Sequence, residues 1–323
     1  MPTRALAFLG RHATAFMAGG VLVGLAVPPL AAAAGPLLVP TLLIPLTLAL
    51  IRLDWRAVVA WRARPGVIAL LVVWLLVAAP VLVWLLAEAL RPAGLPASLQ
   101  VALVLMAASS PIVSSVAIAL IVGLDAALAI VAVLVATALV PFTLPAMAQA
   151  LLGVTLEIGL GAFMLRLVLL VGSAFVAAWL VQHFVAPAAI ARRRDLLDGL
   201  TVLNLVVFAL AIMDGVTAFA IARPGYAAAA LAAAFGFNLL LQATGYALFR
   251  RLGRRAALAV ALASGNCNMG LVLVALQGKA DFEVTVFFAL AQIPMYTLPA
   301  LMARAYARLL GRAPGTARQP TVK

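Results

Sequence analysis

Long apolar runs, separated by short groups of charged residues, glycine or proline, follow one another along almost the whole chain. A helix that crosses a bilayer needs about 20 mostly apolar residues to span roughly 30 Å of hydrocarbon. Ten runs are long enough, so the pattern predicts ten transmembrane helices. Their expected ranges are 13–33, 36–52, 66–90, 98–123, 125–151, 160–186, 197–221, 226–249, 256–277 and 282–307.

Composition supports this prediction and excludes a soluble fold. The chain is 67% hydrophobic and 10% charged, with a mean hydropathy of +1.22. Soluble domains are roughly 45–50% apolar and about 25% charged, so they have enough polar surface to cover a core. This chain does not, and its expected partner is therefore the lipid bilayer.

The net charge of +13 raises the alternative of nucleic-acid binding. Most of the 22 basic residues, however, lie at the ends of apolar runs, as the positive-inside rule describes, so no nucleic-acid partner is expected. The rule predicts an inner-membrane protein with both termini in the cytoplasm. The residues expected on the inner side are Arg4, Arg11, Arg52, Arg56, Arg62, Arg64, Arg192, Arg193, Arg194, Arg250, Arg251, Arg254, Arg255, Arg304, Arg308, Arg312, Arg318 and Lys323.

The first apolar run also has features of a signal peptide, since basic residues precede it and an alanine-rich stretch ends it. Retaining it gives an even number of helices and a consistent charge pattern, so it is expected to be the first helix. Residues 1–12 then form a cytoplasmic N-terminus, and residues 309–323 form a disordered cytoplasmic tail. The single cysteine, Cys267, excludes an intrachain disulfide.

Two of the predicted helices carry residues that break helices. The fourth contains Ser109-Ser110-Pro111 followed by Ser114-Ser115, and the ninth contains Ser264-Gly265-Asn266-Cys267-Asn268-Met269-Gly270. Proline removes a backbone donor and clashes with the preceding turn. Irregular backbone at membrane depth is tolerated where it is buried in protein or lines a cavity. Kinking or close helix packing is the plainer alternative for either break alone.

The two breaks occupy corresponding places in the two halves of the chain. Each falls in the fourth helix of a set of five, which predicts a first repeat over 13–151 and a second repeat over 152–308 with inverted topology. Paired interrupted helices of this kind are the best sequence indication of a transporter binding site. The free N–H groups of half-helix N-termini there favour an anion. The expected substrate-binding residues are Ser110, Ser114, Ser115, Asn266, Cys267 and Asn268.

At these residues the chain resembles the bile acid:sodium symporter family, within the wider group that contains arsenite permeases and auxin-efflux carriers. The resemblance rests on the segments Leu53–Trp55, Arg64–Pro65, Ala79–Pro80, Phe237–Asn238, Gly245–Tyr246, Ser114–Ser115 and Ser264–Gly270. It implies ten helices arranged as a panel domain and a core domain. It also implies that the two broken helices cross each other in the core.

Several positions depart from the pattern of sodium-coupled members. The family's acidic residue and glutamine around the second break are replaced by Ala263 and Cys267, and the asparagine of its Ser-Asn pair is replaced by Ser115. Hydroxyl groups expected on the fifth helix are replaced by Ala129 and Val133. Hard cations require several oxygen ligands, so a sodium site is doubtful and no metal or other cofactor is expected. Arsenite is disfavoured as well, since the first break has no cysteine.

Other polar residues inside predicted helices are candidates for weaker roles. Asp214 and Asn204 share a face of the seventh helix and are candidates for coupling or gating, although Asp214 is also explained as a solvated helix end. The pair Asn238 and Gln242 suits helix–helix hydrogen bonding. Gln292 and Tyr296 suit either packing or cavity lining. Asp195 or Asp198 is expected to pair with one of the arginines at 192–194.

The expected function is that of a secondary transporter for a small organic solute, an organic anion in the first instance, which is independent of sodium or coupled differently. A non-transporting membrane sensor or partner subunit with the same fold is one alternative, and a sodium-coupled organic anion symporter is another. Enzyme activity is not expected, since the sequence has no catalytic triad, phosphate loop or metal motif. The sequence predicts no particular oligomeric state.

Overall fold

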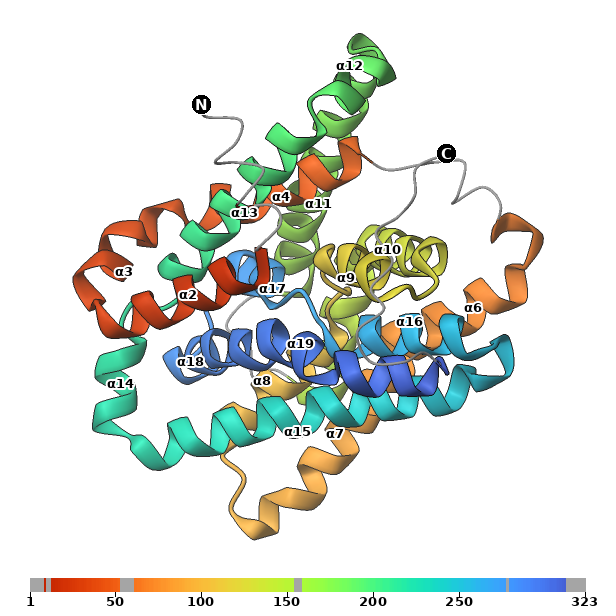
Figure 1. Cartoon of the computed structure of the whole chain (residues 1–323). Helices are drawn as coiled ribbons and strands as arrows, with labels where there is room; N and C mark the ends of the chain where they lie inside the picture. The colour runs from red at the N-terminus through yellow and green to blue at the C-terminus, as the bar shows by residue number, and fades with distance from the viewer. Residues whose placement is uncertain (1–8, 10–12, 53–60, 154–158, 277–278, 312–323) are drawn as a thin grey trace.

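The computed structural model describes residues 9, 13–52, 61–153, 159–276 and 279–311, which form helices joined by short connections (Figure 1). In this described part of the chain there is no β-strand, and six helical runs are long and apolar enough to cross a membrane. These runs are Pro28–Ile51, Pro65–Ala93, Ala126–Leu152, Leu160–Phe184, Arg194–Ala222 and Pro224–Leu252. The prediction of an all-helical membrane protein is confirmed at this level.

The first predicted boundary was wrong. Helix α2 (Ala13–Ala26) ends at a turn, and α3 (Pro28–Ala34) continues through a short 3-10 segment into α4 (Leu38–Ile51). Residues 28–33 therefore belong to the second helical run, not to the first. The cause is Pro28 and Pro29, because proline lacks an N–H and fits the first turn of a helix, where that N–H has no partner.

The next helices follow the predicted ranges closely. Helix α6 (Pro65–Val73) continues through a π-helical segment into α7 (Ala79–Leu90), as predicted for 66–90. The predicted fourth helix is two short helices, α8 (Ala97–Ala108) and α9 (Ser114–Val122). Helix α10 (Ala126–Leu152) then begins at Asp125, whose side chain accepts a hydrogen bond from the Leu128 N–H.

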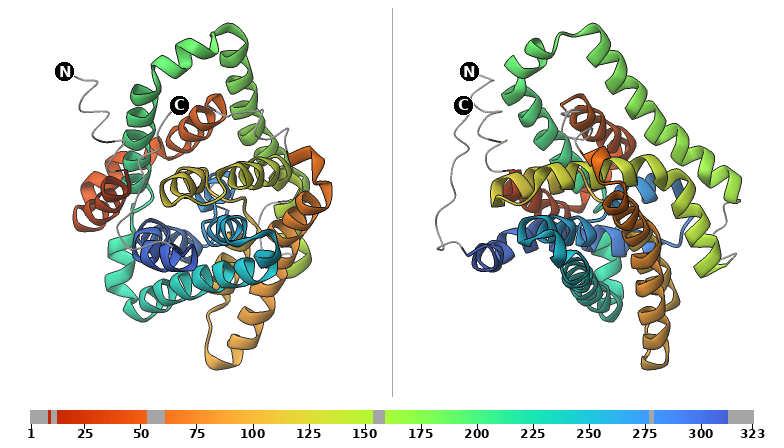
Figure 2. Two further views of the ribbon diagram at one scale, coloured as in Figure 1. Left: turned by 45° about the vertical axis from the view of Figure 1, so that its right-hand side comes forward. Right: turned by 90° about the vertical axis from the view of Figure 1, so that its right-hand side faces the viewer.

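Helices α11 (Leu160–Phe184) and α13 (Arg194–Ala211) are joined by short α12 (Pro187–Arg192) into an arch that projects from the rest of the chain (Figure 2). The predicted continuous helix over 197–221 is interrupted, because α13 ends in a turn before α14 (Val216–Ala222). Gly215 in that turn has φ +73°, a left-handed conformation that a regular helix does not contain.

The last helices contain the second predicted break. Helix α15 (Pro224–Phe249) matches the predicted eighth helix, whereas the ninth is divided into α16 (Arg254–Gly265) and α17 (Met269–Leu276). The predicted tenth helix is also divided, into α18 (Phe282–Leu290) and α19 (Gln292–Leu309), which meet at Ala291. Both predicted breaks, near Pro111 and near Cys267, are confirmed.

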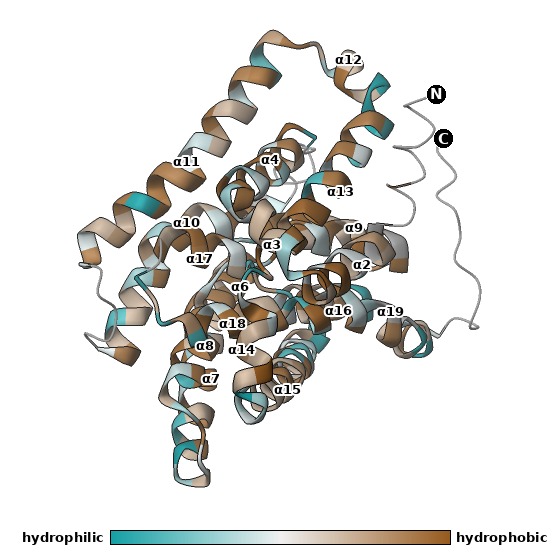
Figure 3. Cartoon of the chain, turned by 90° about the vertical axis from the view of Figure 1, so that its left-hand side faces the viewer, coloured by the Kyte–Doolittle hydropathy of each residue, from teal (hydrophilic) through white to brown (hydrophobic). Residues whose placement is uncertain are grey.

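The helices pack closely on one another. Helix α13 packs against α2 and α4, and α11 packs against both α4 and α10. Helix α16 packs against α15 and α10, and α8 packs against α7 and α18. Apolar residues cover much of the outward surface, as on α11 (Figure 3), where Leu165, Leu169 and Trp179 are exposed. Such a surface suits lipid, not water. Most of the predicted N-terminal segment and tail, and Leu53–Trp55, lie outside the described residues.

Candidate functional site

The two chain breaks cross and pair with each other. The Ile112 N–H donates to the Asn266 carbonyl oxygen at 2.8 Å, and the Asn268 N–H donates to the Ser110 carbonyl oxygen at 2.7 Å. Between these two bonds, Pro111 lies opposite Cys267 in an isolated antiparallel bridge. The irregular backbone is thus satisfied inside the protein, as the apolar depth of a membrane requires.

Proline suits its place in this bridge. In an antiparallel pair, facing residues alternate between those that exchange both hydrogen bonds and those that exchange none. Pro111 and Cys267 are a pair of the second kind, since the bonds come from the residues on either side. The missing N–H of Pro111 therefore costs no ladder bond, while its ring prevents α8 and α9 from forming one continuous helix.

A cavity of about 740 Å³ adjoins the crossing. Helices α9 and α17 both begin beside it, so the positive ends of two helix dipoles lie near one space. The polar side chains in its lining come from several helices. They are those of Thr41, Arg52, Ser114, Arg194, Asp198, Thr201, Cys267, Asn268, Gln292 and Tyr296.

The six predicted binding residues fall into two groups. Ser114, Cys267 and Asn268 line the cavity. Ser110, Ser115 and Asn266 are fully buried and do not belong to its lining. Each of these three has a side-chain oxygen without a hydrogen-bond partner among the described residues, although the Asn266 amide donates to the Leu262 carbonyl oxygen at 2.8 Å. Three buried side-chain oxygens without partners in the described part of the chain thus lie at the crossing, next to the residues that line the cavity.

The structure does not bring the two coupling candidates to the cavity. Asn204 donates to the Thr41 carbonyl oxygen at 2.6 Å, which ties α13 to α4. Asp214 is exposed in the turn after α13. Neither residue lines a cavity described here. Their shared helix face, which the sequence predicted, is lost because the helix is interrupted beyond Ala211.

Gln292 and Tyr296 line the cavity and are also buried, so the structure combines the two predicted roles of packing and cavity lining. The Gln292 amide donates to the Phe288 carbonyl oxygen at 3.1 Å, and its own side-chain oxygen is without a partner in the described part of the chain. The Tyr296 hydroxyl is likewise buried and unpaired among the described residues. Unpaired buried polar atoms are costly, so their presence in a cavity wall favours a ligand role.

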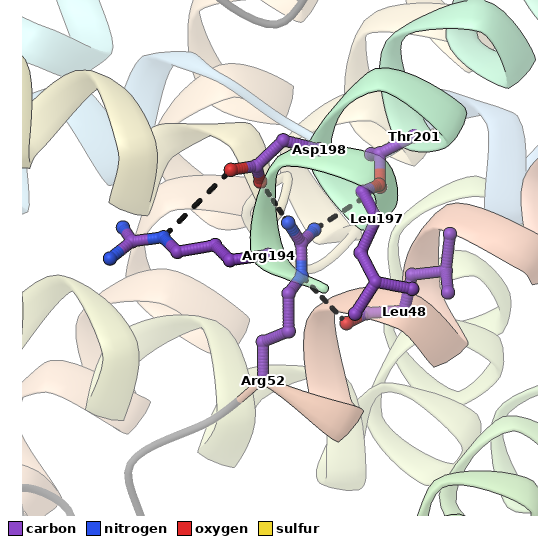
Figure 4. Close-up of polar contacts among 6 residues, drawn as sticks. All are labelled: Leu48, Arg52, Arg194, Leu197, Asp198 and Thr201. Carbon is purple, nitrogen blue, oxygen red and sulfur yellow. Dashed lines mark hydrogen bonds and ion pairs between the residues drawn. The ribbon is translucent and has the colours of Figure 1, made fainter. Parts of the chain in front are cut away.

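Sequence reasoning missed a charged cluster in the lining of this cavity, whose polar contacts are drawn in Figure 4. Arg52, at the end of α4, pairs with Asp198 on α13, and Arg194 Nε lies 3.8 Å from the same carboxylate. Pairing of Asp195 or Asp198 with one of the arginines at 192–194 was predicted, but the partner 146 residues away was not. The signal for it was weak, because Arg52 was explained by topology alone and Asp198 by its neighbouring arginines.

A second cavity, of about 810 Å³, shares this charged cluster with the first. It extends between α10 and the arch of α11, α12 and α13, and its lining is mainly apolar. Gln182 is in its wall and donates to the carbonyl oxygens of Leu50 and Ile51 at 3.0 and 2.9 Å, at the C-terminal end of α4. Arg52, Asp198 and Arg194 thus lie where the two cavities meet.

Side chains of helix α15 form hydrogen bonds that stabilise the second break. The Asn238 amide donates to the Gly265 carbonyl oxygen at 2.6 Å, the Gln242 amide donates to Asn238 Oδ1 at 2.6 Å, and the Tyr306 hydroxyl donates to Gln242. The predicted helix–helix role of Asn238 and Gln242 is confirmed. On another side, Trp74 Nε1 donates to Ser264 Oγ at 2.8 Å. These buried contacts hold the crossing in one geometry.

The positions that the resemblance aligns with sodium ligands lie in the protein interior. Ala129, Val133 and Ala263 are buried and supply no side-chain oxygen. Among the described residues, no group of three or more His, Cys, Asp or Glu residues is arranged to hold a metal ion. Comparison of the chain with known protein families, and with curated proteins, finds no match.

Proposed function

We propose that this protein is a secondary transporter for a small organic anion. The observation that carries the proposal is the paired crossing of two interrupted helices beside a cavity of about 740 Å³. Irregular backbone is expensive at membrane depth, and it persists where it builds a binding site. A ligand at the crossing would meet helix N-termini, Ser114, Asn268 and the unpaired hydroxyl group of Tyr296.

An anion suits this environment better than a cation. The two helix N-termini present partial positive charge, and the charged residues of the cavity lining are two arginines and one aspartate. Its remaining lining is mainly apolar, which suits an organic body attached to the anionic group. A carboxylate accepts hydrogen bonds from hydroxyl and amide N–H groups such as those of Tyr296 and Asn268, both of which line the cavity.

The proposed transport mechanism is alternating access in a fold of two inverted five-helix repeats. Helices α2, α4, α11 and α13 would form the panel domain, and α6–α10 with α15–α19 would form the core domain. The contacts of α13 with α2 and α4, and of α11 with α4, support this division, and the contact of α11 with α10 would lie between the two domains. Under the orientation that the basic residues predict, the cavity end at Arg52 faces the cytoplasm. The described conformation would then be the inward-facing one.

We propose transport without sodium. The buried alanines at positions 129 and 263, together with Val133, leave few side-chain oxygens for a hard cation, which needs several. The resemblance to sodium symporters would then concern the fold and the crossing, and the ion site would have been lost.

The test is counterflow in proteoliposomes loaded with one unlabelled monocarboxylate, with its labelled form outside, in sodium, potassium or choline buffer. Equal exchange in the three buffers is the expected result. Exchange that occurs only with sodium would overturn sodium independence and favour a symporter. Ligand-induced thermal stabilisation without exchange would favour a sensor of the same fold. If neither exchange nor stabilisation occurs with any carboxylate, the anion assignment fails.

Replacing Tyr296 by phenylalanine separates binding from folding. The variant loses an unpaired buried hydroxyl, so its stability is expected to stay unchanged or to rise by up to about 1 kcal/mol. Its affinity for a bound carboxylate is expected to fall about tenfold, because a hydrogen bond to a charged group contributes about 1.5–3 kcal/mol. Thermal unfolding with and without the carboxylate measures both quantities.

The matched control is Tyr306→Phe, on the same helix. Tyr306 donates to Gln242, so its replacement is expected to lower stability by about 1 kcal/mol and to leave carboxylate affinity unchanged. If Tyr296→Phe destabilises the protein as much as the control does, the Tyr296 hydroxyl has a structural partner, and its ligand role is refuted.

A further inference from the structure

Arg52 is held at the junction of the two cavities by contacts that differ in kind. Its Nε donates to the Leu48 carbonyl oxygen at 3.0 Å, and its Nη2 donates to Thr201 Oγ1 at 3.2 Å. Its Nη1 pairs with Asp198 Oδ1 (Figure 4). Two neutral oxygens thus position the guanidinium from α4 and α13, while a single anion occupies the remaining edge.

The exposed fractions of the side chains indicate that Asp198 is the partner of Arg52 that another anion can replace. The Arg52 side chain is 22% exposed, whereas that of Asp198 is 42% exposed and that of Arg194 is 73% exposed. The more buried cation is therefore anchored by backbone and hydroxyl oxygens, and the carboxylate opposite is half in solvent. A partly exposed ion pair contributes little to stability, so exchange of its anion costs little.

The charge balance of the junction is incomplete. Arg52, Arg194 and Asp198 are the charged side chains in the lining of both cavities, as far as the described residues show. Two guanidinium groups face one carboxylate, which leaves one excess positive charge. A second carboxylate would be attracted to this place, and it would compete with Asp198 for the edge of Arg52.

We propose that Asp198 is an internal competitor for an anion-binding site at Arg52, where the two cavities meet. A carboxylate solute displaces Asp198 from Arg52, and Arg194 retains the displaced Asp198 side chain. No covalent bond changes. Asp198 thereby sets how tightly an anion binds before it reaches the crossing of the broken helices. This inference rests on the proposed function and names a specificity-determining step in it.

A purely structural ion pair between α4 and α13 predicts a different result. Removing either partner of such a pair would harm the protein in the same direction, and carboxylate binding would change little or fall in both variants. An internal competitor predicts effects of opposite sign. Arg52→Gln removes the binding group, whereas Asp198→Asn removes the competitor and raises the excess positive charge from one to two.

The experiment measures binding of potassium acetate, benzoate and octanoate to the purified full-length protein by thermal shift. A neutral, lipid-free detergent excludes a lipid headgroup as the source of the anion. Asp198→Asn is expected to strengthen binding about tenfold and Arg52→Gln to weaken it about tenfold, with the double variant close to Arg52→Gln. The control pair is Glu88 and Arg91, an exposed ion pair with an N–O distance of 3.1 Å outside both cavities, whose Gln variants are expected to bind as the original protein does.

Unchanged or weakened binding in Asp198→Asn would overturn the proposal, as would undetectable binding of all three carboxylates to that variant. A response to added anionic lipid, without a response to the three soluble carboxylates, would overturn it too. Counterflow distinguishes its failure from that of the proposed function. If the original protein exchanges carboxylate but the two variants bind alike, only the role of Asp198 fails. If binding shows opposite signs and no exchange occurs, only transport fails.

Discussion

Gly265→Ala is expected to destabilise the protein by about 3 kcal/mol, the largest effect on folding among the substitutions considered. A Cβ at this position would lie 2.6 Å from Gln242 Cγ, 2.7 Å from Asn238 Oδ1 and 2.9 Å from the Asn238 backbone oxygen. The backbone atom belongs to α15 and yields only if that helix moves. Such a shift would also stretch the 2.6 Å bond between Asn238 and the Gly265 carbonyl oxygen.

Thermal unfolding in detergent measures the effect, and a fall of roughly 6–12 °C in the melting temperature corresponds to it. The matched control is Gly236→Ala on α15, where a Cβ would meet nothing within 4 Å. That variant is expected to be as stable as the original protein or slightly more so, since alanine favours a helix. Equal melting temperatures for the two variants would mean that α15 does not press on the crossing as described.

Ser114→Asp is expected to weaken carboxylate binding at least 100-fold without harming the fold, the largest expected effect on function. Ser114 is the first residue of α9 and lines the cavity beside the crossing. Two like charges about 4 Å apart repel by about 4 kcal/mol at an effective dielectric constant near 20. An aspartate in the first turn of a helix, however, stabilises that helix by about 0.3–1 kcal/mol.

Ser114→Asn is the control, because asparagine has nearly the same shape as aspartate without its charge. It is expected to bind carboxylate within a fewfold of the original protein. Binding is measured by thermal shift in sodium-free buffer, with melting of the unliganded protein as the measure of folding. Unchanged carboxylate binding in Ser114→Asp would refute the proposal that the anion binds at the crossing. Stronger binding of organic cations by that variant than by the control would indicate that the natural solute is a cation.

The positions of the broken helices were predictable because their causes are local. Pro111 lacks the donor that a continuous helix needs, and Ser264–Gly270 combines glycines with three polar side chains between apolar residues. The turn near Asp214 had a local signal as well, since Asp-Gly is a turn dipeptide. It was missed because the surrounding apolar run was read as one helix. Pro28-Pro29 was a comparable signal for the start of α3.

The charged cluster where the two cavities meet was not predictable in the same way. Arg52 and Asp198 are 146 residues apart, and each was explained without the other, Arg52 by topology and Asp198 by its neighbouring arginines. Gln292 and Tyr296 were equally ambiguous, because their spacing of four places them on one helix face without indicating what that face contacts. Only the packing of α19 and α13 around the crossing decided these cases.

From the sequence alone it was possible to predict that a lipid bilayer surrounds this protein and where its helices break. Apolar length, charge at the ends of apolar runs, proline and glycine act within one or two turns of the chain, so a single segment carries the information. Tertiary structure decided which side chains share a cavity, which carbonyl oxygens Asn238 and Arg52 bind, and where Pro111 meets Cys267. Those relations depend on the distances between segments far apart in the chain, and side-chain hydrogen bonds and charge pairs form only over a few ångströms.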